Sequence, residues 1–219
     1  MSHFFKKFQL SILLFIITLL IIPTSFTFAT PTTATPTDEL ASLLSSFQGM
    51  TAQFKQVVAG NKKIPGQTST GKMALQRPGK FRWDVQQPNP QLLIADGRYL
   101  WIYDVDLEQA TRQKLDTSNT SSPASLLSGS VSSLRDRFDV ARLPESGNMT
   151  GFRLKPFNNS DLFQWIELYF TDGKLSKMLL QDNLGALNTF YFSNVQMNPA
   201  LKASLFQFNP PKGVEVIKN

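Results

Sequence analysis

The chain has 219 residues, a formal net charge of +6, one histidine and no cysteine. The lack of cysteine excludes disulfide bonds, thiol chemistry and a lipoprotein-type leader, which needs a cysteine to carry its lipid. The positive charge contains no run of Lys or Arg longer than two residues. The clustered basic stripe expected of a nucleic-acid-binding protein is therefore missing as well.

Residues 1–29 have the pattern of a cleaved signal peptide. Lys6-Lys7 precede an apolar run over residues 8–22, and small residues around Ala29 suit a signal peptidase. Cleavage is expected after Ala29, with Ala34 as the alternative. The apolar run is shorter than the roughly 20 residues that span a bilayer, although a retained N-terminal anchor is the competing interpretation.

Removal of the signal lowers the formal charge from +6 to +4, because Lys6 and Lys7 leave with it. The remaining chain of about 190 residues is long enough to fold on its own core without disulfides. We therefore expect a soluble protein in the periplasm of a Gram-negative bacterium, with no affinity for nucleic acid.

The N-terminal part of the mature chain predicts a tether followed by a helix. Residues 30–37 are rich in Pro and Thr and are expected to be flexible, and one domain is expected over 38–219. A helix is predicted over 38–48, with Thr37 as its cap and Gly49 as its end. Its apolar face consists of Leu40, Leu43, Leu44 and Phe47.

Most of the remaining chain shows strand signals separated by turn signals. Asp96-Gly97 and Asp172-Gly173 are typical of tight hairpins. Residues 121–137 interrupt this pattern and predict one or two short helices, with Ser121 or Ser122 as cap and Pro123 in the first turn. The fold class is therefore mainly β, an antiparallel meander curled into a barrel or half-barrel. The predicted strands cover 51–58, 68–76, 80–85, 91–96, 98–104, 109–115, 151–156, 163–170, 174–181, 187–195 and a short final segment before residue 218.

The sequence offers little for catalysis or metal binding. The only histidine, His3, leaves with the signal, so the Ser-His and Cys-His arrangements and ordinary zinc ligation are excluded. Asp104 and Asp106 resemble a carboxylate pair, but the glycine and distal glutamate of a calcium loop are missing. We interpret them as solvated residues at a strand end. No enzyme activity, cofactor or metal is expected.

Several strands are apolar on both faces, which a sheet with one solvated face does not need. In the strand over 98–104, Leu100 and Ile102 lie on one face, and Tyr99, Trp101 and Tyr103 on the other. Either a helix covers the second face or the sheet curls around an apolar cavity. The two predicted helical segments could close such a cavity as a lid. Their inward leucines would be Leu43, Leu44, Leu126 and Leu127.

Five stretches resemble the LolA family of periplasmic carriers of outer-membrane lipoproteins. They are "FQGMTAQFKQ", "GKMALQRPGKFRW", "QLLIADGRYLWIYDVDLEQAT", "SPASLLSG" and "FNPPKGVEVI". The resemblance implies an unclosed antiparallel β-barrel with a lid of short α-helices over an apolar cavity for acyl chains. It also implies a monomer that takes acylated lipoproteins from an inner-membrane ABC transporter and delivers them to an outer-membrane receptor.

The resemblance also assigns roles to single residues. Arg77 would hold the lid closed by donating hydrogen bonds to lid carbonyls, and Phe81 would contact the transporter. Pro78 removes a backbone donor, which would leave Arg77 at the rim of the sheet with five guanidinium donors available. The cavity lining is assigned to Phe54, Trp83, Leu93, Leu100, Ile102, Leu168, Phe170 and Phe190.

Alternatives remain at this point. Arg77 could be a solvated strand-end arginine, and Phe81 and Trp83 could simply pack in a core. The outer-membrane receptor would share this architecture, but it should carry an acylated cysteine. A periplasmic module of the same fold that senses lipids or lipoproteins is the other alternative, and an additional C-terminal domain would favour it.

Overall fold

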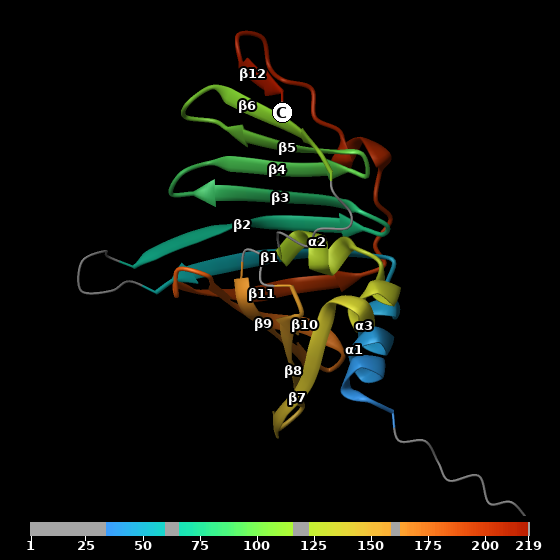
Figure 1. Ribbon diagram of the computed structural model, residues 1–219. Coiled ribbons are helices and arrows are strands. Elements are labelled where there is room, and N and C mark those ends of the chain that lie inside the picture. Colours follow the sequence, from blue (N-terminus) through green and yellow to red (C-terminus); the bar gives the residue numbers. More distant parts are fainter. Residues whose placement is uncertain (1–33, 60–65, 116–122, 159–162, 219) are drawn as a thin grey trace, which may run out of the picture. The chain divides into compact units, whose positions relative to one another are not determined.

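Twelve strands form one curled sheet in the part of the chain that the structure describes (Figure 1). This computed structural model describes residues 34–59, 66–115, 123–158 and 163–218. The predicted signal peptide, the first residues of the tether and the Ser121 or Ser122 cap lie outside these residues. The strands are β1 (Gly49–Val58), β2 (Gln67–Gln76), β3 (Lys80–Gln87), β4 (Gln91–Asp96), β5 (Tyr99–Asp104), β6 (Gln109–Lys114), β7 (Phe138–Ser146), β8 (Met149–Pro156), β9 (Phe163–Thr171), β10 (Lys174–Asp182), β11 (Leu187–Met197) and β12 (Glu215–Lys218).

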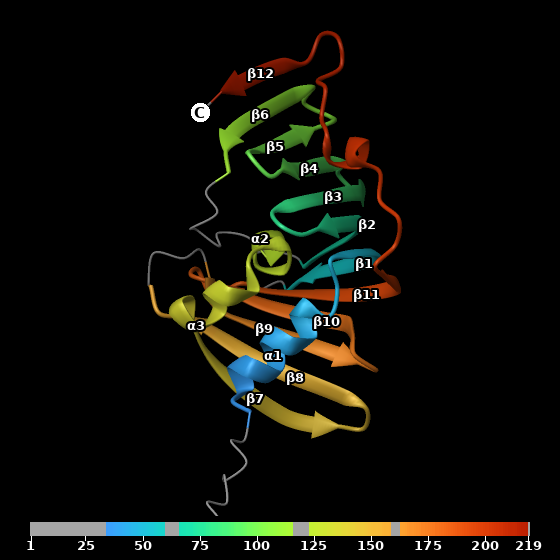
Figure 2. The same ribbon diagram turned by 90° about the vertical axis from the view of Figure 1, so that its right-hand side faces the viewer.

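Two antiparallel meanders make up the sheet and meet where β1 pairs with β11. The strand order is β12-β6-β5-β4-β3-β2-β1-β11-β10-β9-β8-β7, so β7 and β12 lie at opposite edges. The sheet curls without closing, which confirms the predicted unclosed β-barrel (Figure 2). The final strand β12 was predicted, but it pairs parallel to β6 and so departs from the meander.

The register places one row of apolar side chains across the concave face. Met73 in β2 lies opposite Trp83 in β3, which lies opposite Leu93 in β4, which in turn lies opposite Ile102 in β5. Because side chains alternate between the two faces of a strand, these four residues point to the same side. The apolar residues that alternate in "KFRWDV" are therefore the ones on the concave face.

The first helix, α1 (Pro36–Ser45), differs at both ends from the prediction. Its cap is Thr35 and not Thr37, and Thr35 and Asp38 form a reciprocal capping box with Pro36 in the first turn. The helix therefore takes two residues from the predicted tether. It ends four residues before Gly49, which instead begins β1.

The segment predicted as one or two helices contains three short ones. They are α2 (Pro123–Ser128), the 3₁₀ turn η1 (Val131–Ser133) and α3 (Leu134–Arg137). The strand that follows, β7, was missed by the sequence analysis. It is an edge strand with Pro144 in it and few buried side chains, so its alternating pattern is weak.

The outer face of β4 and β5 is covered by the chain that follows β11. The 3₁₀ turn η2 (Ala203–Phe206) packs against β3 and β4. Phe208 then lies between Trp101 and Tyr103, with its ring centroid 5.3 Å from each. This strap explains why β5 is apolar on both faces, because one face lines the concave side and the other packs under the strap.

Candidate functional site

Arg77 lies at the rim of the concave face and contacts both helices that cover it. Its Nη1 donates to the carbonyl oxygen of Leu44 at 2.6 Å. Its Nε and Nη2 both donate to the carbonyl oxygen of Leu127, at 3.1 and 2.7 Å. One guanidinium group therefore links α1 to α2.

The two acceptors lie in the last turns of their helices. The final carbonyls of a helix have no partner within it, and this end of the helix dipole attracts a cation. Arg77 meets both needs in α1 and α2 at once. Burial lowers the pKa of Arg77 to about 10, so the guanidinium remains charged at neutral pH.

The backbone of the β2–β3 turn strengthens this arrangement. The N–H of Arg77 donates to the carbonyl of Gln48 at 2.8 Å, and the N–H of Gly79 donates to that of Ser128 at 2.9 Å. The guanidinium also stacks on Phe47, with its central carbon 4.7 Å from the ring centroid. Gly79 adopts a φ of 68°, which favours glycine. The Arg-Pro-Gly turn therefore holds the C-terminal ends of both helices.

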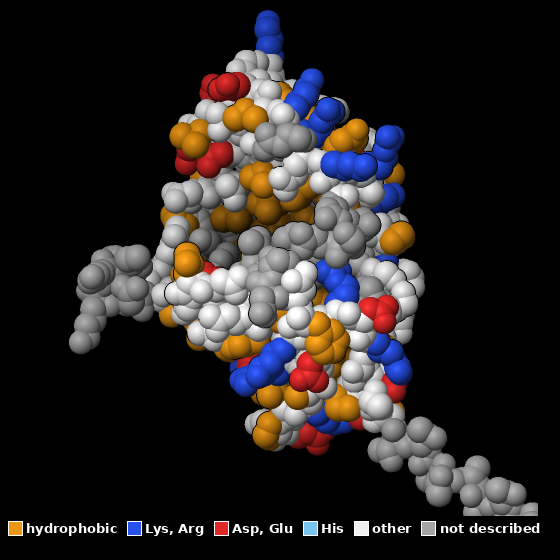
Figure 3. Space-filling view, viewed as in Figure 1, with side chains coloured by type: hydrophobic (Ala, Val, Ile, Leu, Met, Phe, Trp, Pro, Cys, Tyr) orange, Lys and Arg blue, Asp and Glu red, His pale blue; other side chains and the backbone are white. Residues whose placement is uncertain are grey.

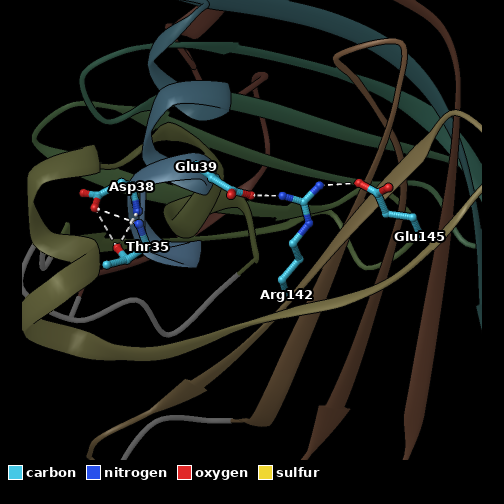
Figure 4. Close-up of polar contacts among 5 residues, drawn as sticks. All are labelled: Thr35, Asp38, Glu39, Arg142 and Glu145. Carbon is cyan, nitrogen blue, oxygen red and sulfur yellow. Dashed lines mark hydrogen bonds and ion pairs between the residues drawn. The ribbon is translucent and has the colours of Figure 1, made fainter. Parts of the chain in front are cut away.

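The other end of α1 is fixed by capping and by ion pairs (Figure 4). Thr35 and Asp38 cap the first turn through mutual hydrogen bonds. Glu39 pairs with Arg142 of β7, which also pairs with Glu145. The Thr35 hydrogen bonds keep the pKa of Asp38 below its usual value. α1 is therefore anchored to β7 at its start and to the β2–β3 turn at its end.

Four aromatic side chains pack together on the concave face. Phe54 stacks on Trp83 at 4.2 Å between centroids, and Phe190 and Phe192 meet Trp83 edge-on at 5.6 and 6.4 Å. Gly71 makes room for this cluster, because a Cβ there would lie 2.7 Å from the Phe54 ring. Phe54, Trp83 and Phe190 are among the residues assigned to the cavity lining from the sequence, whereas Phe192 and the need for Gly71 were missed.

The predicted lining residues share the concave face but differ in exposure. Leu168 and Phe170 are buried in the core together with Leu40 and Leu44 of α1. The lining residues of β4 and β5 are only partly buried. Figure 3 shows an apolar hollow in the molecular surface on the side of these strands. The lining residues of β4 and β5 are Leu93, Leu100 and Ile102.

The lid leucines and Phe81 lie where the helices meet the sheet. Leu44, Leu126 and Leu127 are buried and Leu43 is partly buried, all in contact with the core. Phe81 is 3% exposed and lies between Leu75 and Ala95 in its row. It is therefore inaccessible to another protein while the helices are in this position.

A polar cluster on the outer face was also missed by the sequence analysis. Glu167 is 4% exposed and accepts hydrogen bonds from Arg153 Nε at 2.8 Å and from the Tyr169 hydroxyl at 2.6 Å. The guanidinium of Arg153 lies 5.0 Å from the ring of Trp165. Strand alternation could have placed these residues on one face, but it could not have predicted that they make a buried contact with one another.

No catalytic or metal site emerges from the described residues. Asp104 accepts a hydrogen bond from the Leu107 N–H at 3.1 Å, which agrees with its interpretation as a residue at a strand end. Within the described ranges, no three His, Cys, Asp or Glu side chains are grouped as they would be around a metal ion. None of the described helices is long and apolar enough to cross a membrane.

Comparison with known sequences finds close relatives along most of the chain. The chain is 43% identical over 185 residues to an outer-membrane lipoprotein carrier protein of Legionella pneumophila, covering 84% of this chain and 90% of the relative. It is 42% identical over 179 residues to that of Pseudomonas aeruginosa, covering 82% and 86%. It is 40% identical over 183 residues to that of Coxiella burnetii, covering 83% and 86%.

Among solved structures, a DUF1329 family protein of Desulfovibrio piger matches with a TM-score of 0.50 at 11% identity, over 78% of this chain and 95% of that one. That likeness concerns the fold alone. Residues 45–209 match the family model described as outer membrane lipoprotein carrier protein LolA. Together with the sequence relatives, this match shows that the chain belongs to the LolA family.

Proposed function

We propose that this protein is a periplasmic chaperone that carries acylated lipoproteins from an inner-membrane ABC transporter to an outer-membrane receptor. The observation that carries the proposal is the position of Arg77. It joins two short helices over an apolar concave face through hydrogen bonds to Leu44 and Leu127. Such a lid can be released without unfolding the sheet beneath it.

The energies of the lid and the cargo are comparable, which suits a carrier. Burial is worth about 0.8 kcal/mol per methylene, so one acyl chain of ordinary length gains roughly 10 kcal/mol when fully sheltered. A hydrogen bond to a charged group contributes about 1.5–3 kcal/mol, so the contacts of Arg77 with two carbonyl groups total roughly 3–6 kcal/mol. Binding can therefore open the lid, and closing the lid offsets much of the binding energy.

Release follows from the same competition. When cargo displaces the lid from the concave face, the leucines of α1 and α2 lose their apolar contacts and the two carbonyls lose Arg77. Both are recovered when the lid closes, so the lid and the acyl chains compete for one surface. A receptor that shelters the chains without opening a lid of its own would then take the cargo.

We assign the transporter contact to Phe81. In the closed form this side chain is buried on β3, against which α2 packs. Displacement of α2 would expose it at the rim beside Arg77. Contact with the transporter would then be limited to a carrier whose lid is open.

Removal of residues 1–29 would leave a soluble monomer in the periplasm, and 30–35 would precede the first helix as a tether. The apolar concave face supports binding of acyl chains and not catalysis, so we assign the protein no enzyme activity and no cofactor.

The test is a release assay. Spheroplasts of a strain with a competent lipoprotein transporter are incubated with the purified mature protein, and the supernatant is probed for acylated lipoproteins. We expect release that depends on the added protein. Absence of release, while a homologous carrier releases lipoproteins in the same preparation, would count against the proposal.

A further inference from the structure

The concave face has two parts that differ in what covers them. The covered half is formed by β8, β9 and β10, where Leu168, Phe170 and Met178 are at most 2% exposed. They belong to one core with the leucines of α1, and Figure 2 shows α1 lying over these strands. An acyl chain that enters the covered half must therefore displace α1.

The second part, the standing hollow, is formed by Val85, Leu93, Leu100 and Ile102 on β3, β4 and β5. All four side chains are only partly buried, and Figure 3 shows the surface hollowed on this side. A chain that enters here covers apolar surface that is still in contact with water. Among the described helices, α2 packs against β2 and β3, and the 3₁₀ turn η2 packs against β3 and β4 from the outer face.

Two boundaries set the standing hollow apart. Towards the covered half stands the aromatic cluster of Phe54, Trp83, Phe190 and Phe192, whose members are 3–8% exposed. Towards the edge of the sheet, the residues paired with Ile102 and Leu100 are the polar Thr111 and Gln113 of β6. The apolar strip between them spans three strands, or about 10 Å.

Resting on the carrier function proposed above, we propose that the standing hollow is a separate site for a single acyl chain. It is filled while Arg77 still holds Leu44 and Leu127. Only cargo with further chains displaces α1 and gains the covered half. The hollow therefore accepts single-chain amphiphiles, whereas lid opening selects multiply acylated ligands.

The test locks α1 in place. The Glu39→Cys/Arg142→Cys double variant replaces an ion pair between α1 and β7 in a chain that has no other cysteine. A short bifunctional thiol reagent then joins the two positions, and the double variant without reagent is the control. The probes are a fluorescent sixteen-carbon fatty acid and a synthetic triacylated cysteinyl lipopeptide.

We expect the cross-link to leave the affinity for the fatty acid within about twofold, as for independent sites. It should weaken binding of the triacylated lipopeptide by at least roughly tenfold, or ~1.4 kcal/mol. In the unlocked protein, Leu100→Gln should weaken binding of the fatty acid by about tenfold, because an amide replaces apolar surface. Lys114→Gln, at an exposed position of β6, is the matched control.

The outcomes separate this inference from the carrier function. If the unlocked protein binds both probes and the cross-link weakens both equally, the carrier function stands and the two-part site is wrong. If the unlocked protein binds the fatty acid alone, and does so with or without the cross-link, the hollow stands and the carrier function is wrong. Binding of neither probe by the unlocked protein overturns both.

Discussion

Arg77 donates through Nη1 to the carbonyl oxygen of Leu44 at 2.6 Å, across 33 positions of the chain. This bond ties the end of α1 to the turn between β2 and β3, and the same side chain holds α2 through Leu127. Both acceptors are backbone atoms at helix ends, so the contact does not depend on which side chains the helices carry. Arg77 therefore holds the C-terminal ends of both lid helices from one point on the rim.

Replacement of Arg77 by leucine should loosen both helices. The loss of two carbonyl contacts at about 1.5 kcal/mol each predicts roughly hundredfold faster hydrogen exchange for the last-turn amides of α1 and α2. In a transfer assay, cargo should remain with the Arg77→Leu carrier, because a lid that closes weakly displaces it less. Hydrogen-exchange mass spectrometry and transfer to the purified receptor measure the two effects.

Arg82→Leu is the matched control for this substitution. Arg82 lies on the outer face of β3, where it pairs with Asp84 at 3.6 Å and points away from the lid. We expect normal exchange in α1 and α2 and normal transfer. Transfer at the wild-type rate by Arg77→Leu would show that the arginine does not act on the lid.

The ion pair between Glu39 and Arg142 should matter much less than Arg77. Both side chains are about a third exposed, at 31% and 39%, and exposed pairs contribute about 0–1 kcal/mol. Glu39→Gln should therefore leave transfer unchanged and shift the urea midpoint only slightly. Raising the ionic strength screens exposed pairs and so weakens this one. The lid should nevertheless stay closed, because Arg77 still holds it. A loss of transfer in Glu39→Gln would show that the ion pairs, and not Arg77, keep α1 in place.

The strands could be predicted from the sequence because apolar segments are separated by clear turn signals. "KFRWDV" has one apolar face, whereas "QLLIAD" is apolar on both, and its second face packs under the chain that follows β11. The positive φ of Asp172 and Gly173 confirms the hairpin predicted at that pair. Some errors of the prediction were local ones at the ends of elements. The helix cap was assigned to Thr37, although Thr35 followed by Pro36 is the better signal for a first turn.

The division of the concave face could not be predicted from the strands. Leu100 and Leu168 occupy equivalent inward positions on their strands, so periodicity treats them alike. Only the position of α1 distinguishes them, and that position depends on Arg77 and on an ion pair to β7, a strand that the sequence analysis missed. Long-range contacts of this kind leave no trace in a local pattern.

Gly71→Ala should destabilise the sheet beside the aromatic cluster. A Cβ at this position would lie 2.0 Å from the carbonyl oxygen of Asp84 and 2.7 Å from the ring of Phe54. The backbone oxygen cannot move without breaking the β2–β3 ladder, so we expect a loss of about 1–3 kcal/mol in the free energy of unfolding. Urea denaturation followed by tryptophan fluorescence measures it. Thr70→Ala, the neighbouring exposed position, should have a much smaller effect, and equal losses would contradict the steric explanation.

Tyr169 should make the stability depend on alkaline pH. Burial, together with its hydrogen bond to Glu167, raises the pKa of Tyr169 to about 12. In the unfolded chain the phenol has a pKa of about 10, so between pH 10 and 12 the unfolded state releases a proton that the folded state keeps. The free energy of unfolding must therefore fall as the pH rises through this window, whereas the contribution of Tyr169 is fully present below pH 10.

Tyr169→Phe should reduce this slope, because it removes the titrating group. The relevant measurement is the change in the free energy of unfolding from pH 9 to pH 11.5, and not its value at one pH, since the variant also loses its bond to Glu167. Tyr191→Phe, at a side chain 51% exposed on the neighbouring outer face, is the control and should leave the slope unchanged. Equal slopes for wild type and Tyr169→Phe would show that the Tyr169–Glu167 contact does not hold the phenol proton in the folded protein.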